Sequence, residues 1–135
     1  FKITDLQSSL GLSQLSKLEE FIKLKNELYR QYSKNINEKY LKSFNEYETP
    51  WFVDFYCNNE NQRDKLHVYL QEKNIETRFS YPSLSSQSYL QNIEKTDLTL
   101  SEKISNTVLW LPSSTNLSKE DIEYVSRAVN NFLEN

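Results

Sequence analysis

The sequence predicts a mixed α/β fold, in which a long N-terminal helix precedes a small three-stranded sheet with helices packed on it. From Thr4 to about Leu41 there is no proline, and apolar residues recur at helical spacing. Three short runs rich in β-branched and aromatic residues then alternate with helical stretches. This alternation predicts a sheet covered by helices on at least one face, as one domain of 135 residues.

The N-terminal segment begins with a helix-start signal. Thr4 and Gln7 form a Thr-x-x-Gln capping box, in which each side chain can bond the backbone N–H of the other residue. We expect a helix of roughly 30 residues or more, bent near Gly11. One half of its helical wheel holds the apolar residues Leu6, Leu10, Leu15, Leu18, Phe21, Ile22, Leu24, Leu28, Tyr29 and Tyr32.

The clearest strand follows Pro50. The run "PWFVDFYC" is rich in residues that favour extended backbone. Because side chains alternate along a strand, we expect Trp51, Val53 and Phe55 to share one face. The opposite face then holds Phe52, Asp54 and Tyr56.

Two further strands and three further helices complete the predicted domain. "IETRFSY" and "TVLWL" predict the second and third strands, and each is followed by a proline. Asn58 or Asn59 can cap the helix after the first strand, and Asn74 can end it in the left-handed conformation. Capping boxes predict the starts of the last two helices: Thr99 with Glu102, and Ser118 with Asp121.

These elements divide the chain into two parts. We assign residues 1–41 to a long linking helix and residues 42–135 to a small C-terminal α/β domain. So long a helix is poorly matched to a globule of this size. We therefore expect one of its ends to pack against something outside this chain.

Composition argues against several functional classes. The formal net charge of −3 argues against nucleic-acid binding, which needs clustered lysine and arginine. A single glycine excludes the glycine-rich phosphate loops of nucleotide-binding folds. No apolar run is long enough to cross a membrane, so we expect no membrane partner. One cysteine allows no intramolecular disulfide, which fits a reducing compartment such as the cytoplasm.

No residue pattern announces a self-contained active site. His67 is the only histidine, and we expect an ordinary, partly exposed helix residue rather than a catalytic base. Cys57 ends the first strand and is expected to be a packed thiol rather than a nucleophile. No spacing of His, Cys, Asp and Glu suggests a metal site. The residues alone indicate a soluble α/β domain without catalytic residues of its own.

Three stretches of the sequence resemble motifs of one protein family, and they occur in the same order as in that family. "FKITDLQSSLGLSQL" (1–15), "RDKLHVYLQEKNIETRFSYPSL" (63–84) and "LWLPSSTNLSKEDIEYV" (109–125) span nearly the whole chain. They are similar to motifs of the DegT/DnrJ/StrS-type aminotransferases, which depend on pyridoxal 5′-phosphate and act on nucleotide-linked sugars. The first stretch is the most specific, with small Ser8 and Ser9 where the family has alanines.

The resemblance implies a function for a larger parent protein. The parent would transfer an amino group, with glutamate as the expected donor, to a nucleotide-linked keto-sugar in polysaccharide or glycoconjugate biosynthesis. The family's large domain comes first and carries the lysine that holds pyridoxal 5′-phosphate. This chain would then be the small C-terminal domain of a fold-type I enzyme, cytoplasmic and homodimeric, with no cofactor bound to it and no activity alone.

The same resemblance implies four substrate-binding positions. Lys2 stands at a family arginine near the active site across the subunit boundary, where its shorter side chain loses bidentate contacts. Arg78 and Tyr81 match the family's Thr-Arg and its aromatic residue before proline, on the edge facing substrate. Ser85 replaces a family histidine. The loop 83–89, expected to cover the sugar site, would therefore contact the substrate without the charge that an imidazole can carry.

Two alternatives to these implications stay open. Arg78 can instead be a strand-end charge paired with Glu76 or Asp54. The whole chain can instead be a free-standing α/β binding or regulatory module with no enzyme parent; against this stands a first residue, Phe1, that is not an initiator methionine. If the apolar face of the first helix lacks a partner, we expect the chain to associate through it. The residues specify neither the sugar nor the carbon that is aminated.

Overall fold

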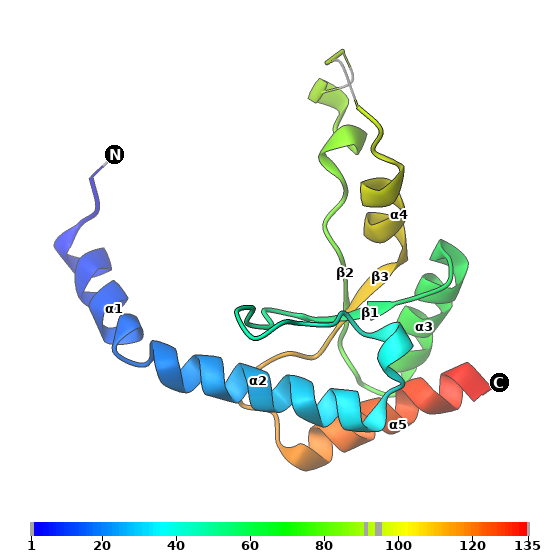
Figure 1. Cartoon of the computed structure of the whole chain (residues 1–135), viewed down its shortest axis with the longest axis horizontal. Coiled ribbons are helices and arrows are strands. Elements are labelled where there is room, and N and C mark those ends of the chain that lie inside the picture. The colour runs from blue at the N-terminus through cyan, green and yellow to red at the C-terminus, as the bar shows by residue number, and fades with distance from the viewer. Residues whose placement is uncertain (1, 91, 94–95, 135) are drawn as a thin grey trace.

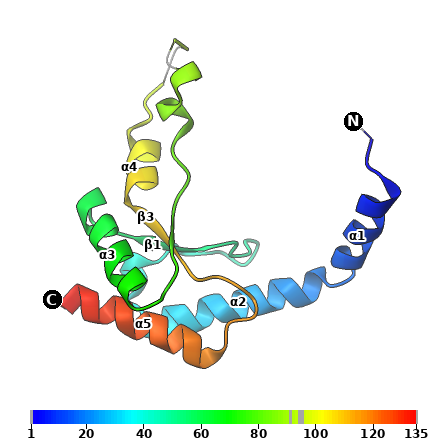
Figure 2. The ribbon, with the colours of Figure 1, turned by 180° about the vertical axis from the view of Figure 1, so that it is seen from behind.

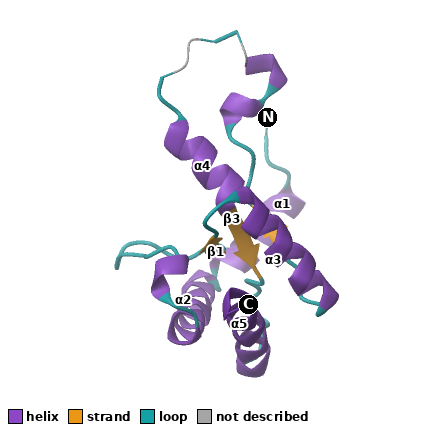
Figure 3. Cartoon of the chain, turned by 90° about the vertical axis from the view of Figure 1, so that its right-hand side faces the viewer, coloured by secondary structure: helices purple, strands orange, loops and turns teal. Residues whose placement is uncertain are grey.

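The computed structural model describes residues 2–90, 92, 93 and 96–134 and confirms the mixed α/β class (Figure 1). Helices α2 (Leu18–Asn35), α3 (Glu60–Glu72) and α5 (Lys119–Glu134) pack on one face of a small sheet (Figure 3). Helix α1 (Asp5–Leu15) leads away from this body. Helix α4 (Thr99–Thr107) and the turns Leu84–Ser86 and Ser88–Leu90 form an arm that points away from α5 (Figure 2). Phe1, where the family-like motif begins, lies outside the described residues.

The sheet has three antiparallel strands in the order β1-β3-β2. Strands β1 (Val53–Tyr56) and β3 (Val108–Leu111) lie where their sequences predict them. Strand β2 is limited to Arg78–Phe79 and is shorter than the run "IETRFSY" suggests. The reason is that Ile75 donates its backbone N–H to Leu70 at 2.9 Å, which closes the end of α3 instead of extending the strand.

The core lies between the sheet and helices α2, α3 and α5. Tyr32 of α2 is fully buried and donates its hydroxyl to the carbonyl of Pro112 at 3.0 Å, which fixes α2 to the end of β3. Phe55 of β1 is also fully buried and stacks on Tyr40, with ring centroids 5.4 Å apart. The remaining buried core residues are Leu28, Ile36, Leu41, Val53, Cys57, Leu66, Leu70, Ile75, Leu109, Leu111, Ile122, Val125, Ala128 and Val129.

The predicted long helix is divided in two, and the division is not at Gly11. Ser16 donates its hydroxyl to the carbonyl of Ser13 at 2.8 Å, and the N–H of Lys17 bonds the carbonyl of Gln14 at 3.0 Å. These bonds tighten the last turn and end α1. Gly11 lies inside α1, and a Cβ added there would meet no atom within 4 Å. The expectation of a bend near Gly11 is therefore wrong.

Most of the predicted helix caps are confirmed. The Thr4–Gln7 box forms at α1, and the Asn59 side chain accepts the N–H of Gln62 at 2.9 Å at the start of α3. Asn74 ends α3 with a φ of 57°, in the left-handed region. At α5, Ser118 Oγ accepts the N–H of Asp121 at 3.1 Å, and the Asp121 carboxylate accepts the N–H of Ser118 at 3.0 Å.

The predicted capping box at Thr99 and Glu102 is wrong. Thr99 is the first residue of α4 rather than its cap, and its N–H bonds the side chain of Asp97 at 3.0 Å. Glu102 accepts a hydrogen bond from the Ser85 hydroxyl at 2.8 Å instead of returning to the helix start. Two competing side chains, one of them distant in sequence, therefore replace the local box.

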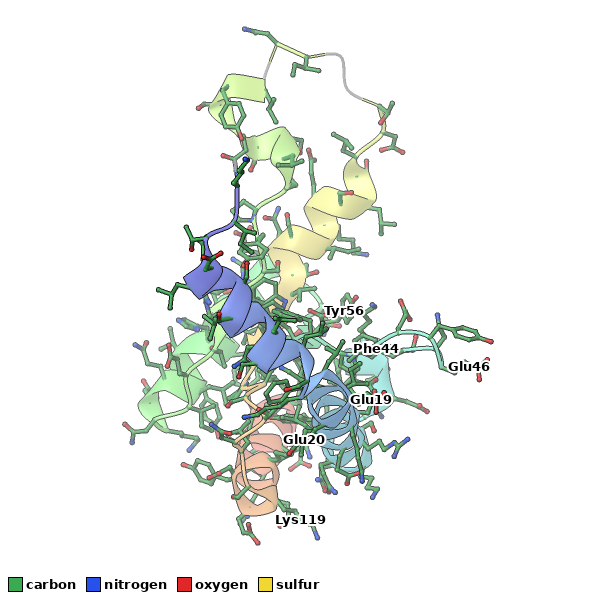
Figure 4. The ribbon with its side chains drawn as sticks, turned by 90° about the vertical axis from the view of Figure 1, so that its left-hand side faces the viewer. Glu19, Glu20, Phe44, Glu46, Tyr56 and Lys119 are labelled. Carbon is green, nitrogen blue, oxygen red and sulfur yellow. The ribbon has the colours of Figure 1, made fainter. Side chains whose placement is uncertain are left out.

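Short 3₁₀ turns occupy the connections. Residues Glu38–Tyr40 (η1) follow α2, and Leu84–Ser86 (η2) and Ser88–Leu90 (η3) lie in the arm. Figure 4 shows Glu19 and Glu20 near the start of α2, and Phe44 and Glu46 on the loop that precedes β1. No helix among the described residues is long and apolar enough to cross a membrane.

Candidate functional site

The face of the sheet turned away from α2 and α5 carries a row of polar and aromatic side chains. Trp110 of β3 lies opposite Asp54 of β1 on one side and opposite Arg78 of β2 on the other. Residues directly opposite each other in antiparallel strands share a face, so these three form one row across the sheet. The core side of the same strands holds Val53, Phe55, Leu109 and Leu111.

Trp110 lies at the centre of an aromatic cluster. Its indole stacks on Phe52, with ring centroids 4.0 Å apart and planes inclined by 9°. Tyr81 meets the same indole edge-on at 4.9 Å. The indole Nε1–H donates to the Asp54 carboxylate at 2.7 Å, so the ring is held from three directions. This contact network gives the polar row a rigid centre.

Asp54 is the acidic group of this row. Its burial beside the aromatic rings raises the pKa of the carboxyl, while the hydrogen bond from Trp110 and the charge of Lys42 lower it. Burial and the nearby Asp54 charge also raise the pKa of the Tyr56 hydroxyl. A half-buried carboxylate with one oxygen bonded to an indole can still accept hydrogen bonds from a ligand hydroxyl.

A first cavity, which we call the arm cavity, lies between this face and the arm. Its volume is about 570 Å³, and it contains Asp54, Tyr56, Trp110 and Tyr81. Within it, Ser85 bonds Ser83 and Glu102, each at 2.8 Å. Five hydroxyls from serines line the same cavity: Ser80, Ser83, Ser85, Ser101 and Ser105. The lining also includes Leu84, Leu98, Ile104 and Val108, so the cavity offers apolar surface together with hydroxyls and no cationic side chain among its described lining residues.

A second cavity, which we call the edge cavity, lies where β2 begins and β3 ends, beside the start of α5. Its volume is about 870 Å³, and its lining includes Trp51, Arg78 and Lys25 of α2. The Lys25 ammonium donates to the carbonyls of Trp51 at 2.8 Å and Ser113 at 2.6 Å. Burial lowers the pKa of Lys25. Trp110 borders both cavities and separates them.

The structure brings three of the four predicted site residues together. Arg78 and Tyr81 lie on either side of Trp110, and Ser85 lines the same cavity as Tyr81. Lys2 is exposed ahead of α1 and lines neither cavity. The substrate-binding role of all four residues stays a prediction.

The ion pair that was the alternative role of Arg78 does not form among the described residues. Within the described ranges, Arg78 makes no ion pair with Glu76 or Asp54, and Asp54 bonds Trp110 instead. The expectation that His67 and Cys57 have no catalytic role stays a prediction. His67 bonds the Thr77 hydroxyl at 2.7 Å, and burial raises the pKa of the Cys57 thiol to about 12, which keeps it protonated.

Of the lysines that the structure describes, Lys25 and Lys73 line one of these two cavities, and each already makes another contact. Pyridoxal 5′-phosphate is held by a lysine amine at the centre of its pocket. Among the described residues that line the arm cavity there is no lysine. In the edge cavity, Lys25 is occupied by two carbonyls, and Lys73 lies over the ring of Tyr69 at 4.7 Å. No group of His, Cys, Asp and Glu in the described part of the chain could hold a metal ion.

Sequence reasoning missed Trp110, Asp54 and Lys25 as members of the site. The available signal for Asp54 was a lone acidic residue within the aromatic-rich run "PWFVDFYC". Nothing local marks Trp110 or Lys25, because their contacts come from residues 56 and 88 positions away, respectively.

The amino-acid sequence of this chain is similar to the sequences of known proteins. The profile of the DegT/DnrJ/EryC1/StrS aminotransferase family matches residues 1–130. GDP-perosamine synthase of Escherichia coli O157:H7 is 29% identical over an alignment of 136 positions, which covers 98% of this chain and 37% of the relative. The dTDP-3-amino-3,6-dideoxy-alpha-D-galactopyranose transaminase of Aneurinibacillus thermoaerophilus is 25% identical over an alignment of 139 positions, which covers 97% of this chain and 37% of the relative.

Solved structures agree on the fold. A DegT DnrJ EryC1 StrS aminotransferase from Brucella abortus matches with a TM-score of 0.84 and 21% identity, over 97% of this chain and 36% of its own. The chain thus spans little more than a third of the proteins that it matches. At that identity the likeness supports the fold alone.

Proposed function

The chain belongs to the DegT/DnrJ/EryC1/StrS aminotransferase family, and we propose that it is the C-terminal part of an enzyme that aminates a keto-sugar carried by a nucleotide. We further propose that glutamate donates the amino group and that the product enters polysaccharide or glycoconjugate biosynthesis. The enzyme would be a cytoplasmic homodimer.

The family match along residues 1–130 carries this proposal. Its range includes the N-terminal motif and both later motifs. Two relatives support the substrate class, since their names refer to a GDP-linked and a dTDP-linked amino sugar. The hydroxyl-lined arm cavity is a suitable wall for the sugar of such a substrate, with Tyr81 and Ser85 among its lining residues.

Pyridoxal 5′-phosphate would supply the electron sink for the transfer when bound. The lysine that binds it would lie in the part of the enzyme outside this chain, because no lysine described here has a suitable setting. This chain would then contribute a wall of the substrate cleft, with Arg78 near the nucleotide and Lys2 near the neighbouring subunit. Alone, it would neither bind the cofactor covalently nor turn over.

The test compares this chain with the complete product of its gene. Each is supplied with pyridoxal 5′-phosphate, glutamate and a GDP-linked or dTDP-linked keto-sugar, and 2-oxoglutarate formation and cofactor absorbance are measured. We expect both signals from the complete protein only. Activity from this chain alone would overturn its proposed dependence on the missing part. A gene that starts a few codons before Phe1, without a lysine-bearing domain, would instead favour the free-standing module.

A further inference from the structure

The arm cavity contains a carboxylate that has no cationic partner among the described residues. Asp54 forms no ion pair there, and it accepts the neutral indole N–H of Trp110 at 2.7 Å. Lys42, whose charge acts on Asp54, is itself paired with Glu48 at 3.5 Å and lies over the ring of Phe44 at 4.3 Å. Burial raises the pKa of the Asp54 carboxyl, as expected for a charge that its neighbours compensate only in part. A bound cation would supply the missing compensation.

The hydroxyls of the same cavity are arranged as acceptors. Ser80 donates its hydroxyl to the carbonyl of Ser105 at 2.9 Å, and Ser105 donates to the carbonyl of Glu102 at 3.0 Å. Ser85 donates to the Glu102 carboxylate at 2.8 Å. Because a hydroxyl has one proton and two lone pairs, these oxygens can still accept bonds from a ligand. An ammonium group has three donors and no acceptor, so it suits this lining better than a carbonyl does.

An aromatic ring lies beside the carboxylate. The Tyr81 side chain is 68% exposed and meets Trp110 edge-on, with ring centroids 4.9 Å apart. The same indole bonds Asp54, so one buried side chain holds both the ring and the charge in place. Cations are attracted to the faces of aromatic rings. Arg78 lies on the other side of Trp110 and lines the edge cavity only, so its guanidinium is not part of this lining.

We propose that the arm cavity binds an organic ammonium ion, with Asp54 as its counter-ion, serine oxygens as acceptors and the Tyr81 ring beside the cation. A cavity of about 570 Å³ is large enough for a ligand of the size of an amino sugar. This inference goes beyond the proposed function, which places only a neutral keto-sugar here. An amino sugar and an alkylammonium ion are two sources of the same chemistry, a positively charged nitrogen with N–H donors.

The experiment is a titration of this 135-residue chain with glucosamine, followed by proton–nitrogen NMR of isotope-labelled protein at constant pH and ionic strength. The chain has two tryptophans, so two indole N–H signals are observed, and Trp51→Phe assigns them. Trp110 donates its indole N–H to Asp54, whereas Trp51 lines the edge cavity only. We expect a saturable shift of the Trp110 signal and none of the Trp51 signal.

Neutral and sugar-free ligands identify what is recognised. Glucose and N-acetylglucosamine have the sugar ring without the positive charge, and we expect no saturable shift with either. Ethylammonium has the charge without the sugar. Binding of ethylammonium would show that the charge is sufficient, and binding of glucosamine alone would make an amino sugar the ligand. Glucose binding as tight as glucosamine binding, or no saturable shift with either cation, would overturn the proposal.

The central variant is Asp54→Asn, whose amide oxygen can still accept the indole N–H of Trp110. It should weaken glucosamine binding by about tenfold or more, as for loss of a bond to a charged group. The matched control is Glu46→Gln, which removes a carboxylate from the exposed loop before β1, away from the lining of either cavity (Figure 4). It should leave the affinity unchanged. An equal loss in both variants would contradict the role of Asp54.

A second variant keeps the proposal testable if Asp54→Asn does not fold, which circular dichroism determines. Tyr81→Leu retains the carboxylate and removes the ring, and it should weaken binding of both cations by about threefold, as for loss of a cation–π contact. Unchanged affinity would remove Tyr81 from the site.

This result is separable from the transferase assay, because it needs neither cofactor nor amino donor. If the complete enzyme transfers amino groups but no cation binds here, the ammonium site alone fails. If a cation binds here but the complete protein shows no transfer, the transferase proposal fails, and the ammonium site stands as measured.

Discussion

Helices α1 and α5 both carry several large apolar side chains, but the two helices differ in what covers these side chains. In α5, the side chains of Ile122, Val125 and Val129 are buried in the core. In α1 no residue is buried, and Leu6 remains 81% exposed. The body of the molecule therefore has its own core, whereas α1 presents apolar surface to solvent at one end of the structure (Figure 1).

The difference shows that local contacts determine where a helix starts, whereas contacts with distant segments determine what the helix packs against. The capping box of α1 forms within four residues and needs no neighbour, as the Thr4 N–H bond to Gln7 at 2.9 Å shows. Burial of α5 instead depends on contacts with α2 and α3, which are distant in sequence. Stability should follow the second kind of contact, since most helical stability in proteins comes from packing.

The strongest test removes one side chain from each region. Phe55→Ala deletes a fully buried ring and should lower the free energy of unfolding by about 3–5 kcal/mol. Leu10→Ala in α1 removes a side chain that is 63% exposed and should change it by no more than about 0.5 kcal/mol. Urea unfolding at low protein concentration measures both.

The milder variant Phe55→Leu provides a control in case Phe55→Ala does not fold. It should lie between the parent chain and Phe55→Ala in stability. A loss for Leu10→Ala as large as that for either core variant would show that α1 is packed in solution, and the contrast between the two regions would be wrong.

A second test concerns what α1 does with its exposed leucines. We expect the chain to associate through α1, because its exposed leucine side chains are stabilised by removal from water. Burying one leucine side chain contributes about 1.5–3 kcal/mol, so replacing Leu6 and Leu10 together by Gln should weaken association by at least about tenfold. Sedimentation velocity over a range of concentrations measures this.

The matched control for association is Tyr124→Gln, which removes an apolar side chain from the exposed side of α5. It should leave the association unchanged. A parent chain that stays monomeric at high concentration would contradict the expectation, as would equal effects of the α1 and α5 variants.

Local signals in the sequence were sufficient for most of the elements. Strands β1 and β3 were predictable, because their aromatic and β-branched runs favour extended backbone whatever surrounds them. The length of β2 was not predictable, since it depends on how Ile75 closes the end of α3. The false cap at Thr99 has the same origin, because Asp97 and Ser85 bond the groups that the local box would have used.

The candidate site was predictable only in part. Alternation along β1 correctly separated Asp54 from the core-facing Val53 and Phe55. The contact of Asp54 with Trp110 depends on the register of β1 against β3, which is fixed by pairing between segments far apart in the chain. The contacts of Lys25 likewise arise only when α2 crosses the ends of β1 and β3, so no pattern near Lys25 predicts them.

The smallest expected effect comes from the caps, which are alike in chemistry but belong to the two contrasting regions. Ser118→Ala should lower the free energy of unfolding by about 1 kcal/mol, because α5 is part of the cooperative core. Thr4→Ala should leave that free energy unchanged and reduce helical content alone, since an isolated helix as short as α1 is marginal in water. Urea unfolding and far-ultraviolet circular dichroism measure the two quantities.

The α5 cap also predicts a dependence on pH. Bonds from the backbone and hydroxyl of Ser118 lower the pKa of Asp121, so the native state binds fewer protons than the unfolded chain near the ordinary pKa of this carboxyl. Their stabilising effect is present above that ordinary value and is lost as the pH falls through the lowered one. The difference in the free energy of unfolding between Ser118→Ala and the parent should therefore be largest at neutral pH and shrink in acid.

The comparison of the two caps has a contradicting outcome as well. If Thr4→Ala lowered the free energy of unfolding as much as Ser118→Ala does, α1 would belong to the cooperative core.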